Sequence, residues 1–221
     1  MKVSTKQRII KTAIELFNKN GYGASTLFEL ADKKLGMTRG NLTYHFKNKD
    51  QLLLTIVDEM WQKILVERNK SRQLPSFKNL HNEIQLYHRF QQEYAFFFLD
   101  TQVLTHPVIK TKVQEMTTQT IKDCEMAIAF AIASGNMHPE PFKGIYHNIA
   151  FKTWMLSFFW LSQQTILAKQ APKDGSKMVW TMLLPHFTKK GIAAFEAYFG
   201  KEYLENLGKP FDTQIDNFIS F

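Results

Sequence analysis

Residues 26–52 read TLFELADKKLGMTRGNLTYHFKNKDQL, and this stretch decides the fold class of the chain. Thr26 stands three residues before a glutamate, the spacing of a capping box, so a helix is expected to begin here and to end at Gly36. Thr38 is suited to cap a second helix over residues 39–46. Two short helices joined by a tight glycine turn are typical of a helix-turn-helix, which places its second helix in the major groove of DNA.

Helical spacing continues on both sides of this motif. Apolar residues between positions 9 and 17 recur every three or four residues. A long helix is expected over residues 50–68, after a cap at Asn48 with a glutamine three residues on. Further stretches with helical spacing lie at roughly 78–99, 108–134, 141–169, 176–199 and 208–221. No stretch alternates as a strand does. The sequence therefore predicts an all-α protein with an N-terminal three-helix DNA-binding domain, residues 1–49, and a larger helical domain, residues 50–221.

Basic charge is concentrated near the N-terminus. Ten of the 28 lysines and arginines lie in the first 50 residues, against four of the 20 acidic residues. That segment carries a net charge of +6, and the other 171 residues carry +2. A basic end on a nearly neutral body indicates contact with a polyanion, although a solvated basic surface would have the same charge.

Several classes of protein do not fit the sequence. The single cysteine, Cys124, cannot form an internal disulfide, and no signal peptide or membrane-spanning stretch is found. No nucleotide-binding, metalloprotease or nucleophile motif occurs. The histidines lack the spacing of metal ligands, apart from His81 and His88, two turns apart on a helix. We therefore expect a cytoplasmic protein that is not an enzyme and has no metal, no cofactor and no membrane contact.

The second helix of the motif carries side chains suited to reading DNA. Arg39 can bond to guanine O6 and N7, and Asn41 can bond to adenine. Thr43 offers a methyl group to thymine. Tyr44 lies beside these residues, and the basic side chains that follow lie where the helix leaves the groove, within reach of phosphates.

The same residues resemble the helix-turn-helix of the tetracycline-repressor (TetR) family of bacterial transcription regulators. The resemblance covers about residues 5–60 and is most characteristic in the Tyr-His-Phe-Lys-Asn-Lys segment at positions 44–49. The family usually carries an aromatic residue where this chain has Thr43. The resemblance implies contacts with bases or nearby phosphates from Arg39, Asn41, Thr43 and Tyr44, close approach to the duplex at Gly40, and contacts with the DNA backbone from Thr26, His45, Lys47 and Lys49. Stacking of Tyr44 and His45 on the following helix, and simple solvation of the two lysines, are the alternatives.

A homodimer bound to a palindromic operator is expected, because a single recognition helix reads too few base pairs for useful specificity. The helices expected over 141–169 and 176–199 carry more large apolar residues than one core of this width requires. Pairing with their copies in a four-helix interface would bury Leu161, Trp180, Leu183, Leu184, Phe187 and Phe195. The alternative is that these side chains serve only the core of one subunit.

An effector site is expected in the larger domain. Nineteen phenylalanines and four tryptophans are more aromatic bulk than close packing of helices usually needs. Aromatic walls with a few polar groups are typical of sites for small apolar ligands. The candidates are Tyr87, His88, Phe90, Gln91, Tyr94, Phe97, His147, Phe151, Trp154 and Phe158, and for each of them a place in the core is the alternative. The effector is expected to act through the helix over 50–68 on the spacing of the two recognition helices.

Together these expectations describe a ligand-responsive, sequence-specific transcriptional regulator that acts as a repressor. Its expected partners are double-stranded operator DNA, a small-molecule effector and a second copy of itself. A ligand-independent or architectural DNA-binding protein is one alternative, and a helical scaffold whose basic end binds acidic partners is another. Footprinting separates them, since an architectural protein binds with little sequence preference and a scaffold protects no DNA.

Overall fold

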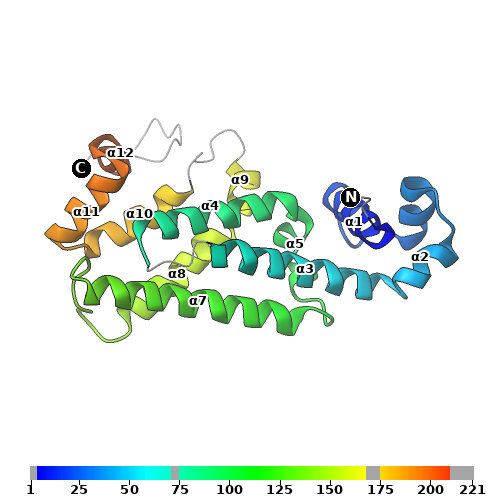
Figure 1. Ribbon diagram of the computed structural model, residues 1–221, viewed down its shortest axis with the longest axis horizontal. Helices are drawn as coiled ribbons and strands as arrows, with labels where there is room; N and C mark the ends of the chain where they lie inside the picture. The colour runs from blue at the N-terminus through cyan, green and yellow to red at the C-terminus, as the bar shows by residue number, and fades with distance from the viewer. Residues whose placement is uncertain (1–3, 71–74, 168–174, 210–221) are drawn as a thin grey trace. The chain divides into compact units, whose positions relative to one another are not determined.

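The computed structural model describes residues 4–70, 75–167 and 175–209, and all of the regular elements in these ranges are helices (Figure 1). The expected all-α fold is confirmed. The helices are α1 Thr5–Asn20, η1 Glu29–Leu35, α2 Arg39–His45, α3 Lys49–Lys70, α4 Phe77–Glu93, α5 Ala95–Leu99, α6 Thr101–Leu104, α7 Lys110–Ala133, α8 Ile145–Phe158, α9 Trp160–Leu167, α10 Ser176–Leu183, η3 Leu184–His186, α11 Lys189–Phe199 and α12 Lys201–Leu207. Most of the tail over 208–221, where helical spacing was expected, lies outside the described residues.

The chain packs into two compact units. Unit 1 joins Met1–Lys70 with Arg89–Met116, and unit 2 joins Ser71–His88 with Thr117–Phe221. Helices α4 and α7 each contribute residues to both units. The division into a DNA-binding domain and a ligand-binding and dimerisation domain at residue 50 concerns function, and it stays a prediction.

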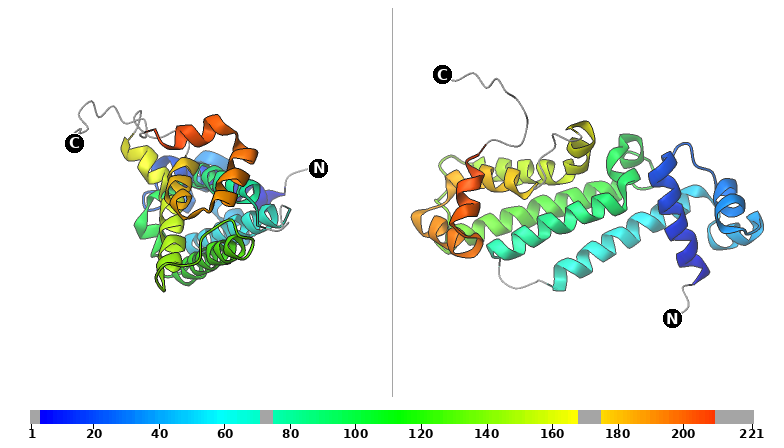
Figure 2. Two further views of the ribbon diagram at one scale, coloured as in Figure 1. Left: turned by 90° about the vertical axis from the view of Figure 1, so that its left-hand side faces the viewer. Right: turned by 90° about the horizontal axis from the view of Figure 1, so that it is seen from above.

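Unit 1 is built around the apolar face of α1. The helix buries the face predicted from its periodicity, and it packs against η1, α3 and α5. Figure 2 (right) shows α1 crossing α3 rather than running along it. The chain segment Arg89–Met116 is therefore part of the same body as the three N-terminal helices, because α5 covers one side of α1.

The expected limits of the helix-turn-helix are confirmed by their caps. Thr26 Oγ1 accepts the backbone N–H of Glu29 at 3.1 Å, and Thr38 Oγ1 accepts that of Asn41 at 3.2 Å. Between them Gly36 adopts φ 61°, a left-handed conformation that costs glycine least. One detail differs from the prediction. Residues Glu29–Leu35 wind as a π-helix rather than an α-helix.

Three helices predicted to be continuous are broken, so those predictions were wrong. The helix expected over 78–99 is interrupted at Tyr94, and the one expected over 141–169 begins only at Ile145 and is interrupted at Phe159. The helix expected over 176–199 ends around Pro185, whose ring would clash with the preceding turn of a continuous α-helix and whose nitrogen has no hydrogen to donate. Pro185 was a signal in the sequence that periodicity alone overlooked.

The restart of this helix is fastened to the end of α7 within unit 2. Thr188 Oγ1 caps α11 by accepting the N–H of Gly191 at 3.0 Å, and the same hydroxyl donates to the carbonyl of Gly135 at 2.7 Å. The N–H of Thr188 donates to the carbonyl of Asn136 at 3.0 Å. Gly191 lies so close to that carbonyl that an added Cβ would stand 2.0 Å from its oxygen. Only glycine fits there without moving the backbone.

This contact predicts a stability effect. Gly191→Ala should destabilise the fold by about 1–3 kcal/mol, because the overpacked atom is a backbone oxygen that cannot rotate away. Thermal unfolding measures the change as a drop in Tm of several degrees. Gly23→Ala is the matched control, since an added Cβ at Gly23 meets nothing within 4 Å. Equal Tm values for the two variants would contradict the packing described.

Candidate nucleic-acid interface

Helix α2 separates its packing side chains from its outward-facing ones. Leu42 and the following Phe46 are 0% and 1% exposed, and they hold the helix on unit 1. Arg39 and Asn41 are exposed, and Tyr44 is 85% exposed. A helix of seven residues is too short to persist alone, so its position depends on these two buried side chains and on its Thr38 cap. The outward face has the donors and acceptors that base edges in the major groove require.

Two small residues complete this face. Thr43 Oγ1 donates back to the carbonyls of Arg39 at 3.0 Å and Gly40 at 3.1 Å, so its hydroxyl proton is used within the helix. Its methyl group is left for the contact with thymine that the sequence predicts. A Cβ added at Gly40 would meet nothing within 4 Å, so the protein's own packing does not require glycine there. Close approach to a duplex would require it.

The predicted phosphate-contacting residues have different surroundings. Lys47 is exposed, and His45 lies edge-on to the ring of Tyr44 at 5.3 Å. Thr26 is exposed but already caps the first helix of the motif. Lys49 Nζ donates to the carbonyl of Tyr22 and lies 4.0 Å from the centre of that ring. Burial lowers the pKa of Lys49, and the neighbouring Asp50 opposes this effect.

A cluster around Tyr22 was missed by the sequence reasoning. The Tyr22 hydroxyl donates to Asp50 Oδ1 at 3.1 Å, and His106 Nε2 lies 3.7 Å from the same oxygen. Burial, together with this hydrogen bond and the charge of Asp50, raises the pKa of Tyr22. The ring of Tyr22 also packs edge-on against Phe17 and His106. The cluster fixes the start of α3, where the helix-turn-helix ends, to the turn that precedes α7.

The start of α3 also has the predicted cap. Asn48 Oδ1 accepts the N–H of Gln51 at 2.8 Å, and Gln51 Oε1 accepts the N–H of Lys47 at 2.8 Å. This reciprocal pair holds the two lysines of the segment on either side of a rigid turn. The local sequence therefore determines where the Lys47 side chain projects from the protein surface.

The effector candidates are divided between the two units. In unit 1, four of them are 4% exposed or less: Phe90, Gln91, Tyr94 and Phe97. The other six belong to unit 2: Tyr87, His88, His147, Phe151, Trp154 and Phe158. The role of all ten stays a prediction.

Three of the unit 2 candidates form a row of rings, and a fourth stacks on a ring that was not predicted. Phe151, Trp154 and Phe158 follow one another along α8 with ring centroids 5.3 and 5.5 Å apart. His88 stacks on Trp160 at 4.8 Å, and His147 Nδ1 lies 2.6 Å from a carboxylate oxygen of Glu125. Trp160 was not singled out from the sequence because it lies beyond the unforeseen helix break.

The interface candidates differ in how much surface they leave to a partner. Four of them lie in the core of unit 2, with exposures of 8% or less: Trp180, Leu183, Phe187 and Phe195. The three aromatic ones pack against Phe77 or one another through edge-on and tilted ring contacts. Leu161 and Leu184 are half-buried. The interface stays a prediction, and these two leucines are the candidates with area left to cover.

Other site types were sought in the described part of the chain. Over residues 4–70, 75–167 and 175–209, no group of three or more histidine, cysteine or acidic side chains is placed to hold a metal ion. Within the same ranges, no helix is both long and apolar enough to cross a membrane.

Comparisons with known proteins match this architecture. The family model described as "Bacterial regulatory proteins, tetR family" matches residues 9–56, and the one described as "Bacterial transcriptional repressor" matches residues 58–195. The HTH-type transcriptional regulator QacR of Staphylococcus aureus is 37% identical over 78 residues, which are 32% of this chain and 41% of QacR. The chain thus spans about two fifths of the length of that relative.

Solved structures are similar over nearly the whole chain. A TetR-family transcriptional regulator from Marinobacter aquaeolei has a TM-score of 0.77 at 21% identity, over 89% of this chain and 99% of its own. A complex of SmeT with triclosan has a TM-score of 0.67 at 17% identity, over 84% and 92%. SmeT is described as the repressor of a Stenotrophomonas maltophilia multidrug efflux pump. At these identities the structures show the shared fold, and the family models, one of which covers more than half of the residues, show that the chain belongs to the TetR family of bacterial transcriptional regulators.

Proposed function

We propose that this regulator is a repressor that binds a palindromic operator as a homodimer and leaves it when a small, largely apolar effector binds. The observation that carries the proposal is the face of α2. Arg39, Asn41 and Tyr44 face outward while Leu42 and Phe46 are buried, on the most basic segment of the chain. In this arrangement base-reading groups stand on a rigid helix, with exposed cations beside them.

Base recognition is assigned to Arg39 and Asn41. Arg39→Ala and Asn41→Ala should each weaken operator binding by about 1–3 kcal/mol per half-site, because each removes hydrogen bonds to one base. Each variant should also lose preference for one base while keeping the others. Selection of operators from random DNA, followed by titration of the selected sequences, measures both effects. Unchanged base preference in both variants would contradict the assignment.

Substitutions of Lys47 and Lys49 should have different effects from those of Arg39 and Asn41, and different effects from each other. Lys47→Ala should weaken binding to all sequences alike and make the salt dependence shallower by about one ion per half-site, with unchanged Tm. Lys49→Ala should produce the same change in salt dependence and also lower the Tm, since Lys49 bonds to the carbonyl of Tyr22. Titrations over a salt series and thermal unfolding separate the two. A Lys47→Ala protein with a changed base preference would contradict the phosphate role.

The effector proposal rests on the aromatic row of unit 2. The rings of Phe151, Trp154 and Phe158 keep exposed area along α8, and an apolar molecule would cover it. His88, stacked on Trp160, supplies a polar group at a ring wall. SmeT, which shares this fold, has been solved with triclosan, a small aromatic molecule.

Dimerisation is proposed through the last helices of unit 2. Leu161 on α9 and Leu184 on η3 are half-buried, and Tyr198 on α11 is 46% exposed. A second copy would cover these apolar groups with its own, as two-fold interfaces do. Light scattering at micromolar concentration should then give twice the chain mass, and a monomer that still binds a palindrome would contradict this part of the proposal.

The effector test uses triclosan and a panel of apolar drugs and metabolites as probes. A true effector should raise the Tm and weaken operator binding. A shift from mostly bound to mostly free DNA requires a difference of about 5 kcal/mol in affinity for the two states. Trp154→Ala should remove the Tm shift, while Phe142→Ala, an exposed ring outside the row, should keep it. Probes that raise the Tm without affecting operator binding would contradict the coupling, and a panel without any stabilising probe would favour a ligand-independent regulator.

A further inference from the structure

The break between α4 and α5 leaves backbone groups that a continuous helix would have paired. Tyr94 has φ −116° and ψ 44°, which is outside the helical region. Its own N–H still bonds to the carbonyl of Phe90 at 2.9 Å. Groups at such an interruption need partners from elsewhere in the protein.

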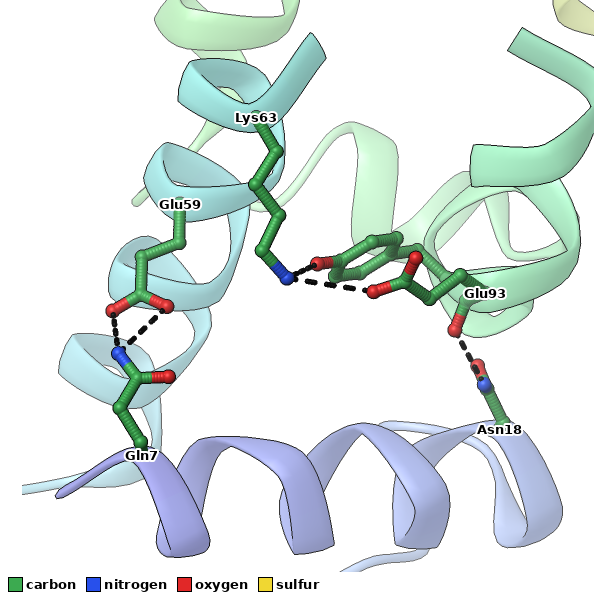
Figure 3. A network of polar contacts seen from close by, with 6 residues as sticks. Gln7, Asn18, Glu59, Lys63 and Glu93 are labelled. Atoms are coloured by element: carbon green, nitrogen blue, oxygen red, sulfur yellow. Dashed lines mark hydrogen bonds and ion pairs between the residues drawn. The ribbon is translucent and has the colours of Figure 1, made fainter. Parts of the chain in front are cut away.

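One side chain from α1 supplies both partners. Asn18 Nδ2 donates to the carbonyl of Glu93 at 2.9 Å, and the N–H of Phe96 donates to Asn18 Oδ1 at 2.9 Å. A single amide therefore bridges the break from one side to the other, as its donor and acceptor allow. Figure 3 shows Asn18 at the end of α1 pointing at Glu93.

Two further contacts hold the same place. Phe17, the neighbour of Asn18, packs edge-on against Phe96 with ring centroids 5.3 Å apart, and both rings are almost fully buried. From α3, Lys63 Nζ donates to the hydroxyl of Tyr94 at 2.8 Å and lies 3.4 Å from a carboxylate oxygen of Glu93 (Figure 3). The helices before and after the helix-turn-helix are thus both fastened to the residues of the break.

We propose that Asn18 is a positioning residue for operator binding: through the α4–α5 break it sets the direction of α1, and with it the half-site spacing that the dimer accepts. The proposal rests on the dimeric, palindrome-binding function proposed above. Its physical reason is that hydrogen bonds fix direction, whereas the Phe17–Phe96 contact by itself tolerates rotation. Without the amide, α1 keeps its apolar contact and loses its fixed angle to the break.

The matched control is Gln7, at the other end of α1. Its side-chain amide also makes two hydrogen bonds between helices, at 3.2 and 3.3 Å to the carboxylate of Glu59 on α3, and it does not contact the break (Figure 3). Asn18→Ala and Gln7→Ala therefore each remove one amide and two hydrogen bonds from α1. A purely structural role predicts similar losses for the two variants.

The experiment uses the operator that the full-length protein selects from random DNA, and versions of it with one or two base pairs inserted or deleted between the half-sites. The preference for the selected spacing should fall at least about fivefold in Asn18→Ala, the low end of typical coupling between sites. It should be unchanged in Gln7→Ala. Asn18→Asp keeps the acceptor for the N–H of Phe96, so its spacing preference should lie between those of the wild type and Asn18→Ala. It replaces Asn18→Ala in the experiment if that variant does not fold.

Each outcome decides between the explanations. Weaker binding at every spacing by the same factor in the Asn18 variants would overturn the positioning role and leave only a structural one. A wild-type protein without spacing preference would refute the proposed palindrome-binding function itself, and the inference with it. A wild-type protein with a preference that the Asn18 variants share would refute the inference alone.

Discussion

The contact between the last turn of α1 and the break after α4 is the constraint on which unit 1 depends. One ring pair and one side-chain amide join segments 75 or more positions apart in the chain. An edge-on aromatic pair adds about 0.5–1.5 kcal/mol beyond its buried area, and each hydrogen bond contributes about as much. Together these are a sizeable fraction of the few kcal/mol by which a domain is stable.

The surface proposed to read DNA depends on this constraint as well as on the packing of α2 itself. Seven residues do not form a stable helix in isolation, so α2 exists because Leu42 and Phe46 are buried and Thr38 caps its first turn. The helices before and after the helix-turn-helix, α1 and α3, are held by Phe96 and Tyr94 of unit 1. The position of Arg39 is therefore set by residues that lie far from Arg39 in the sequence.

The features that could be predicted from the sequence are those determined within a few residues. The Thr26, Thr38 and Asn48 caps and the left-handed Gly36 each depend on a local pattern, and all of them have the expected geometry. The separation of exposed residues from packing residues on α2 follows from the helical period.

Features that depend on distant partners could not be read in this way. The break at Tyr94 has no proline or glycine to mark it, and Asn18, which satisfies it, lies on another helix. Lys49 is a residue type that often contacts phosphates. Its partner within the protein, the carbonyl of Tyr22, is revealed only by the fold. In the sequence, Trp180 and Phe195 look like surplus apolar residues. They are core residues that pack against Phe77, because the chain folds back at helix breaks that the periodicity does not show.

The most direct test of this account is hydrogen exchange of the whole protein under native conditions, followed residue by residue in unit 1. If α1, α3 and α5 form one body, their slowest amides should open with the same free energy and the same dependence on denaturant, as one cooperative unit does. Lower opening free energies over residues 5–46, with residues 95–99 still protected, would show an independent N-terminal domain and contradict the account.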